Sequence, residues 1–234
     1  MVILALDIAV IAIVAFCGWR GYRNGLLRGV FGIVSLVVSL FVASIAATAY
    51  SGDFKEMLSP FVGGVIDKAL TDIMDEGSKS DLGGFDGKSD NYKTAYTALR
   101  RIGLPEPAAA HVAALATEGG KDGVTPETTL SDLISDKLSS TLAFVIVFGI
   151  AFLLLAIIFA VIGNLVGFIF SLPGLRIIDI ITGIAFGLAK GLLIVYTLAA
   201  VVRYAGLLAP DTINGTTVLK YIINNNPIAD IIGI

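Results

Sequence analysis

Long apolar runs separated by polar stretches dominate the chain. Four of these runs are Val2–Trp19, Leu26–Tyr50, Thr141–Leu172 and Ile180–Val202. The hydrocarbon core of a bilayer is about 30 Å thick, and a helix needs roughly 20 apolar residues to cross it. Each run is close to that length or longer. The pattern therefore predicts an all-α membrane protein with four transmembrane helices.

The runs divide the chain into parts of different character. Residues 51–138 contain 15 acidic and 9 basic residues. Apolar positions at helical spacing predict that this segment is a mostly helical insertion, and Thr125-Pro126 is typical of a helix start. The expected organisation is a first transmembrane hairpin at 1–50, the acidic segment at 51–138, a second transmembrane hairpin at 139–204 and a tail at 205–234.

The tail is amphipathic. Val218, Leu219, Ile222 and Ile223 recur at helical spacing, but the stretch is too short to cross a bilayer. We therefore expect an interfacial helix that lies on the outer leaflet.

Arginines in the short connections predict the orientation. Arg20, Arg23 and Arg28 lie at the first connection, and Arg176 lies between the third and fourth runs. Short cytoplasmic loops are enriched in Lys and Arg, so both connections are expected in the cytoplasm. Both termini and the acidic segment 51–138 are then extracytoplasmic.

Composition agrees with a membrane protein and argues against a nucleic-acid-binding one. Hydrophobic residues make up 56% and charged residues 15% of the 234 positions, whereas soluble domains carry about 25% charged residues. The mean hydropathy is +0.89. A net charge of −3 offers no basic field for nucleic acid. The lipid bilayer is therefore the expected surrounding of this chain.

Small residues at four-residue spacing are the clearest motif. Gly183, Gly187 and Gly191 form a row on the fourth run, and Gly163 and Gly167 form a shorter one on the third. Such rows let helix backbones approach closely in lipid. They can pack the bundle of one chain or form an interface in a homo-oligomer, and both interpretations stay open. The same spacing recurs at the first connection, in Gly21, Gly25 and Gly29.

Polar side chains inside the runs are candidates for function, because placing them in lipid is costly. Lys190 lies near the middle of the fourth run, Asp7 near the outer end of the first, and Asn164 inside the third. Lys190 can serve an ion or proton path, or it can reach polar groups at the membrane surface and only orient its helix. Asp179, at the start of the fourth run, is expected to cap its own helix.

A search for catalytic chemistry gives no candidate. His111 is the only histidine and Cys17 the only cysteine, so neither a metal set nor a nucleophile–base pair can be assembled. The sequence has no phosphate-binding loop, zinc-protease or hydrolase motif. We therefore expect a non-enzymatic protein without a catalytic residue, a metal or a cofactor.

Three segments resemble the colicin V production protein family of small bacterial inner-membrane proteins. They are Leu6–Val10 with its early Asp7, the arginine- and glycine-rich Arg20–Gly29, and Asp179–Gly191 with its three spaced glycines and Lys190. The resemblance implies a multi-pass protein of the cytoplasmic membrane with a role in bacteriocin production or export and in envelope physiology. Family members usually have a much shorter link between the second and third spans.

Two hypotheses follow. The first is a non-enzymatic, oligomeric membrane protein of this family that supports toxin secretion or envelope maintenance, with residues 51–138 as the contact for envelope or secretion proteins. The second is a small oligomeric channel or transporter in which Lys190, Asp7 and Asn164 line a polar path.

Overall fold

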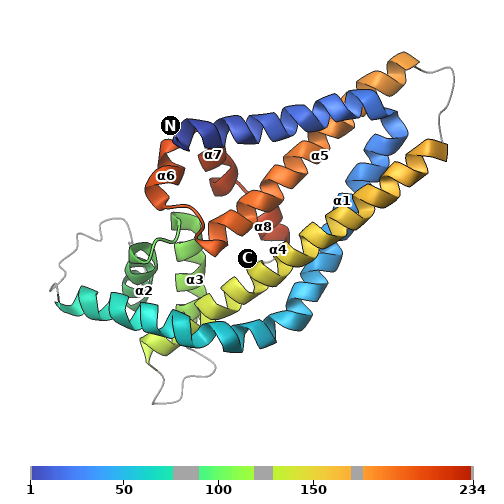
Figure 1. Ribbon diagram of the computed structural model, residues 1–234. Helices are drawn as coiled ribbons and strands as arrows, with labels where there is room; N and C mark the ends of the chain where they lie inside the picture. Colours follow the sequence, from blue (N-terminus) through green and yellow to red (C-terminus); the bar gives the residue numbers. More distant parts are fainter. Residues whose placement is uncertain (1, 76–89, 119–128, 170–175, 233–234) are drawn as a thin grey trace.

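The computed structural model describes residues 2–75, 90–118, 129–169 and 176–232 (Figure 1). Within these residues the chain is helical and contains no strand, which confirms the all-α prediction for this part. The helices are α1 (Val2–Asp75), α2 (Asp90–Arg101), α3 (Glu106–Glu118), α4 (Leu130–Ile169), α5 (Arg176–Ala205), α6 (Pro210–Gly215), α7 (Val218–Asn224) and α8 (Pro227–Ile232).

Helix α1 contains the first two predicted spans. The helix breaks at Gly25, whose backbone has φ 72° and ψ −177°. This conformation is open almost only to glycine. We call residues 2–24 the first arm and residues 26–75 the second arm. Figure 1 shows the two arms diverging from the bend, with α5 beside the first arm and α4 beside the second. A single glycine therefore takes the place of the expected hairpin loop.

Three helices in the described part of the chain are long and apolar enough to cross a membrane: Ile3–Ile73, Leu130–Gly163 and Asp179–Ala205. Four separate spans were expected, and the structure has three such helices, because the first two predicted spans belong to one helix with a bend at Gly25. At 1.5 Å per residue, 71 residues would extend about 107 Å if straight, far more than one crossing of roughly 30 Å.

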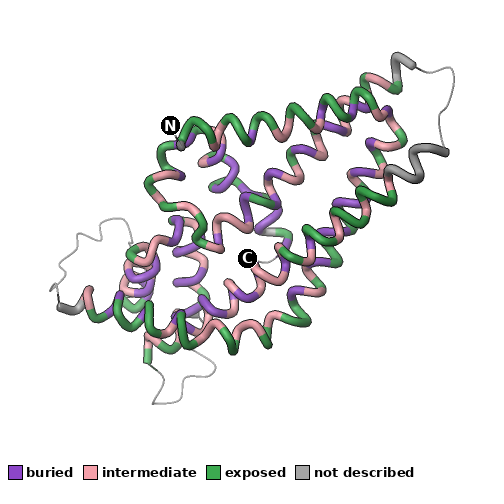
Figure 2. Tube along the Cα trace, in the orientation of Figure 1, coloured by how far each residue is buried: buried purple, intermediate pink, exposed green. Residues whose placement is uncertain are grey.

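Many large apolar residues on these helices are exposed, and Figure 2 shows exposed positions in green along their outer faces. A water-soluble protein does not expose such continuous rows, and lipid is the solvent that suits them. The rows include Ile8, Ile11, Val34, Phe41 and Ile45 on α1, Leu153, Leu154, Ile157, Ile158 and Val161 on α4, and Ile181 and Leu192 on α5. The chain is therefore a membrane protein.

The second arm continues without a break beyond Tyr50, where the predicted span ends. Residues 54–75 of this arm pack with α2, α3, the start of α4 and the end of α5 around a buried core. We call this group of helices the outer domain, because it lies at the end of the molecule away from the bend (Figure 1). One core extends from Leu40 in the apolar run to Ile66, Leu99, Val112 and other outer-domain residues. The outer domain is thus built directly on the spanning helices.

Helix α4 begins in the outer domain with a reciprocal cap. The Asp132 carboxylate accepts hydrogen bonds from the Thr129 backbone N–H (3.0 Å) and hydroxyl (2.7 Å), and the Asp132 N–H donates to the Thr129 hydroxyl (3.2 Å). This is a capping box. The expected start at Thr125-Pro126 lies outside the described residues. Lys55 on the second arm forms an ion pair with Asp136 on α4 (2.5 Å) and joins the two helices here.

The tail folds back onto the helices. Leu219, Ile222 and Ile223 of α7 are buried against Val10 of the first arm and Val195 of α5. The apolar face of the tail helix was expected to meet lipid, but in the structure it packs against protein. Protein covers this apolar face, because the N-terminal half of the first arm and the end of α5 leave room for α6 and α7 between them (Figure 1).

Candidate functional site

A cavity of about 280 Å³ lies near the bend, between the two arms of α1 and helices α4 and α5. Three basic residues, Arg20, Arg28 and Lys190, belong to its lining, together with Asn24. The aromatic rings of Phe16, Phe31, Phe159 and Phe186 also line it, together with Cys17, Ser35 and Ser39. No Asp or Glu belongs to the lining in the part of the chain that the structure describes.

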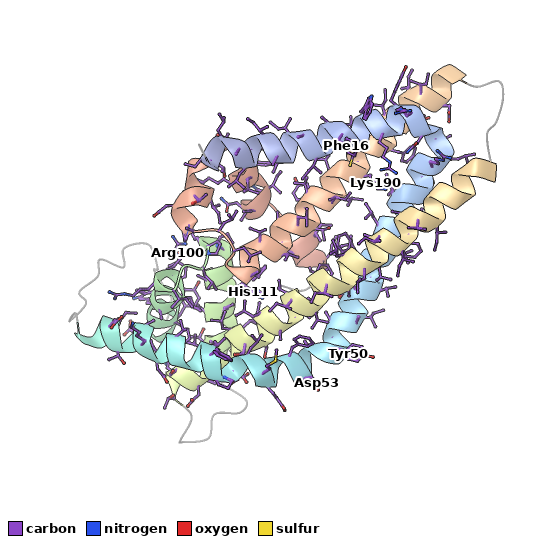
Figure 3. The ribbon with its side chains drawn as sticks, viewed as in Figure 1. Phe16, Tyr50, Asp53, Arg100, His111 and Lys190 are labelled. Carbon is purple, nitrogen blue, oxygen red and sulfur yellow. The ribbon has the colours of Figure 1, made fainter. Side chains whose placement is uncertain are left out.

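Lys190 extends from α5 into this cavity (Figure 3). A Cβ atom at Gly32 of the second arm would lie 3.2 Å from Lys190 Nζ and 3.3 Å from its Cδ. The lysine stem therefore lies along the backbone of the second arm, at a position where glycine leaves space. Helical side chains lean toward the helix N-terminus, so Lys190 leans toward the start of α5, which is the end of the molecule where α1 bends.

The two arginines come from opposite sides of the bend. Arg20 precedes Gly25 by five residues and Arg28 follows it by three, which places their Cα atoms about 8 and 5 Å from it along the arms. The Arg28 guanidinium donates a long hydrogen bond to the Asn24 side-chain oxygen (3.5 Å). Gly32, beside the Lys190 ammonium, lies about 10 Å beyond the bend. The three cations therefore occupy one end of the bundle.

The glycines of α5 pack against the first arm of the same chain. A Cβ atom at Gly183 would lie 2.5 Å from the Gly21 carbonyl oxygen, and one at Gly187 would lie 3.0 Å from Gly21 Cα. Gly191 would place its Cβ 2.9 Å from Val14 Cα. The row Gly21, Gly25 and Gly29 at the first connection thus supplies the partner surface through Gly21 and Gly25. We call this contact the glycine seam.

Asp179 fixes the bend. Its carboxylate accepts a hydrogen bond from the Leu26 backbone N–H (2.6 Å), the first residue of the second arm. Asp179 was expected to cap its own helix, α5. This hydrogen bond instead caps the second arm of α1, which resumes after Gly25. A Cβ atom at Gly25 would collide with this carboxylate. The bend, the start of α5 and the glycine seam therefore form one unit.

Comparison with protein-family models matches residues 6–74 and 109–227 to the family described as Colicin V production protein. These residues include most of both arms of α1, the glycine seam, the bend and Lys190. The chain belongs to the colicin V production protein family. No curated protein and no solved structure matched the chain.

The family match leaves out residues 75–108, which include α2. The acidic segment was expected at 51–138. The family model matches residues 51–74 and 109–138 of that segment, so only its middle part, residues 75–108, is unmatched. In this colicin V production family member, helix α2 buries Tyr92, Ala95, Ala98 and Leu99 in the outer domain. The unmatched part thus contributes to the core of the outer domain.

Asp7, which the sequence suggested as part of a polar path with Lys190, lies elsewhere. Its carboxylate accepts hydrogen bonds from the backbone N–H groups of Thr217 (2.9 Å), Val218 (3.1 Å) and Leu219 (3.0 Å). These groups are the free donors at the start of α7, and a carboxylate is favoured there. Asp7 therefore joins the N-terminal arm to the tail and does not line the cavity.

Other predicted residues are placed as follows. Gly163 lies on α4, where its Cβ would be 3.0 Å from the Phe31 ring, and it lines the cavity. Arg23 is exposed, and its guanidinium lies 5.5 Å from the centre of the Trp19 ring. The surroundings of Asn164, Gly167 and Arg176 are not described, although their backbones belong to α4 and α5.

Several cavity residues were not predicted. Ser35 and Ser39 of the second arm line it, and the Ser39 hydroxyl donates to the Ser35 carbonyl (2.8 Å). Their four-residue spacing within an apolar run places them on one helix face, and that spacing could have indicated a polar cavity. Among the described residues no group of three or more His, Cys, Asp or Glu side chains could hold a metal ion.

His111 belongs to α3 in the outer domain and does not line the cavity. Its ring meets the Tyr204 ring edge-on, with centroids 5.9 Å apart. Burial, and to a smaller extent the nearby Arg203 guanidinium, lower the pKa of His111 below its ordinary value. The folded structure therefore favours the neutral form of the His111 ring.

This shift predicts a pH dependence of stability. In the unfolded chain His111 takes up a proton below about pH 6.5. In the folded chain it stays neutral until the pH falls to its lower pKa. Stability should be complete above pH 6.5 and should fall as the pH drops below it. We expect the thermal unfolding midpoint to fall less for His111→Gln than for the unmodified chain between pH 8 and pH 5.5. An equal fall in both would contradict this role of His111.

Proposed function

We propose that this chain is a non-enzymatic protein of the bacterial cytoplasmic membrane that supports bacteriocin production or export and envelope homeostasis. It acts by holding its outer domain at the extracytoplasmic surface, where this domain meets envelope or secretion proteins. The supporting observation is the continuity of α1. One helix leads from the bend through the apolar run into the outer domain, and one buried core joins the two parts.

A rigid attachment has a testable consequence. The chain is expressed in a bacteriocin-producing strain that lacks its own copy of the gene. A flexible Gly-Ser insertion after Ser51 interrupts α1 between the apolar run and the outer domain. The same insertion after Gly103, in the turn between α2 and α3, is the matched control. We expect the control to restore bacteriocin release and the insertion after Ser51 to fail, with both proteins present in the membrane at equal amounts.

Two outcomes would contradict the proposal. Full bacteriocin release and normal envelope integrity in cells without the gene would contradict the proposed function. Full release with the insertion after Ser51 would remove the rigid attachment. Photo-crosslinking groups at Met57 and Phe61, both exposed on the second arm, identify the neighbours of the outer domain in the same cells.

The proposal requires the outer domain to lie outside the cytoplasm and the bend to lie inside. Single cysteines at Lys68 and Tyr22, both exposed, are introduced into a Cys17→Ser background. An impermeant thiol reagent applied to intact spheroplasts is expected to label the cysteine at 68 and not the one at 22. Lysis should make both equally reactive. Labelling of position 22 alone would reverse the topology.

The cationic cavity favours a second candidate function, an oligomeric channel or transporter with Lys190 in its polar path. Against a relay, Asp7 caps α7 and supplies no acidic partner at the cavity. Liposomes that contain the purified chain distinguish the two. We expect ion flux equal to that of empty liposomes. Flux that disappears in Lys190→Met and partly remains in Lys190→Arg would instead establish the channel.

Homo-oligomerisation is part of the proposal, but the glycine seam is not its interface, because the same chain occupies it. We expect contacts between copies in the membrane to use the exposed apolar rows on α1, α4 and α5. The mass of the protein in mild detergent, measured by light scattering, decides the stoichiometry.

A further inference from the structure

The cavity near the bend has the chemistry of an anion site. Three basic side chains line it, and no carboxylate joins them among the described residues. Cations that share a confined space repel one another, and the repulsion is relieved most when an anion lies between them. Asp179, the acidic residue beside Gly25, is already engaged by the Leu26 N–H.

Lys190 is directed to this site and not to lipid. Its ammonium forms no ion pair or hydrogen bond with the residues that the structure describes, and it lies beside Gly32, on the side of the bend. Intramembrane charges normally pair or reach water. The two non-bridging oxygens of a phosphodiester each accept several hydrogen bonds, so an ammonium and two guanidinium groups at one end of a bundle can share them.

Most of the remaining lining is apolar, and part of it reaches the outside of the bundle. Phe16 is 55% exposed, although it also lines the cavity, and Arg20 is exposed. Trp19 and Tyr22 are exposed on the same turns, and Trp and Tyr concentrate at the level of lipid headgroups. The site thus combines cations for a headgroup with an aromatic surface for the upper part of an acyl chain.

We propose that this cavity binds a phosphate-bearing anion, which a phospholipid of net negative charge supplies from the inner leaflet. Arg20, Arg28 and Lys190 contact the phosphate, and Phe16 lies against the lipid. Basic pockets between spanning helices on the cytoplasmic side are a known form of lipid site. A zwitterionic lipid fits less well, because its own ammonium adds a fourth cation. Binding there ties both arms of α1 to α5 at the bend, independently of the role of the outer domain.

The test uses the full chain in nanodiscs of phosphatidylcholine, with phosphatidylglycerol of the same acyl chains added in steps. Thermal unfolding reports binding. The cavity variants are Lys190→Met and Lys190→Met/Arg28→Gln. The matched control is Arg23→Gln, which removes an equal charge from the same arm at a residue that stacks on Trp19 and does not line the cavity. A separate arm adds inorganic phosphate to nanodiscs of phosphatidylcholine alone.

We expect phosphatidylglycerol to raise the unfolding temperature of the unmodified chain and of Arg23→Gln. Lys190→Met should weaken its apparent affinity by about tenfold, as for loss of one charged hydrogen bond, and the double variant should weaken it further. A Lys190-dependent shift with inorganic phosphate as well would support the anion site and show that free phosphate also occupies it. An equal shift in all variants, or an equal loss in Arg23→Gln, would overturn the proposal.

Discussion

Replacing Gly187 with alanine should strongly destabilise the protein, although the change adds only one methyl group. The new Cβ would lie 3.0 Å from Gly21 Cα and would also collide with the Cys17 carbonyl oxygen. Both are backbone atoms, which cannot rotate away as a side chain can, so α5 must move from the first arm. Overpacking of a tight interior costs about 1–3 kcal/mol, and we expect the upper part of this range. The free energy of unfolding in mild detergent measures the loss.

Gly64 is the matched control for this substitution. It also lies within a helix, but its Cβ would meet no atom within 4 Å. Alanine is favoured over glycine inside a helix by roughly 1 kcal/mol, so Gly64→Ala should be neutral or stabilising. Opposite signs for the two variants identify the seam as the cause. Equal and small effects at both positions would mean that α5 and the first arm do not pack at this distance.

The glycine row on α5 could be found in the sequence, but its partner could not. Spacing shows which residues share a helix face, and it contains no information about which helix meets that face. The structure brings Gly183 and Gly187 to Gly21, in a region that the hydrophobic pattern suggested could be a loop. Because polar Arg20, Arg23 and Asn24 interrupt the apolar run there, the pattern ends before the helix does.

The tail shows a second limit of sequence patterns. An amphipathic helix has the same spacing whether its apolar face meets lipid or protein. Three backbone hydrogen bonds to Asp7 decide the outcome here, because they hold the start of α7 against the first arm. These partners are 210 to 212 residues apart in the sequence, so no local motif could indicate them.

The cavity was predictable in part. The sequence identified Lys190, Arg20 and Arg28 as separate features, one in a span and two at a connection. The lean of helical side chains toward the N-terminus would have brought Lys190 closer to the arginines. The bend that brings both arms of α1 to the same cavity depends on one backbone conformation at Gly25, and that conformation cannot be inferred from spacing.

Replacing Gly25 with alanine should have the other large effect, because two costs coincide at this residue. Its φ of 72° with ψ of −177° strains any residue with a side chain by about 1–3 kcal/mol. The added Cβ would also collide with the Asp179 carboxylate and disturb its hydrogen bond to the Leu26 N–H. We expect a lower free energy of unfolding than in the unmodified chain and a change in the angle between the arms, measured by spin labels on each arm.

A control separates strain from collision. Gly206 also has a positive φ, 62°, but a Cβ there meets no atom within 4 Å, so Gly206→Ala carries a backbone cost without a collision. Gly25→Ala should therefore cost more than Gly206→Ala, and the excess should shrink when Asp179 is already alanine, since the two residues are in contact. If Gly25→Ala costs the same with and without Asp179, the carboxylate does not fix the bend and the conformation of Gly25 alone determines it.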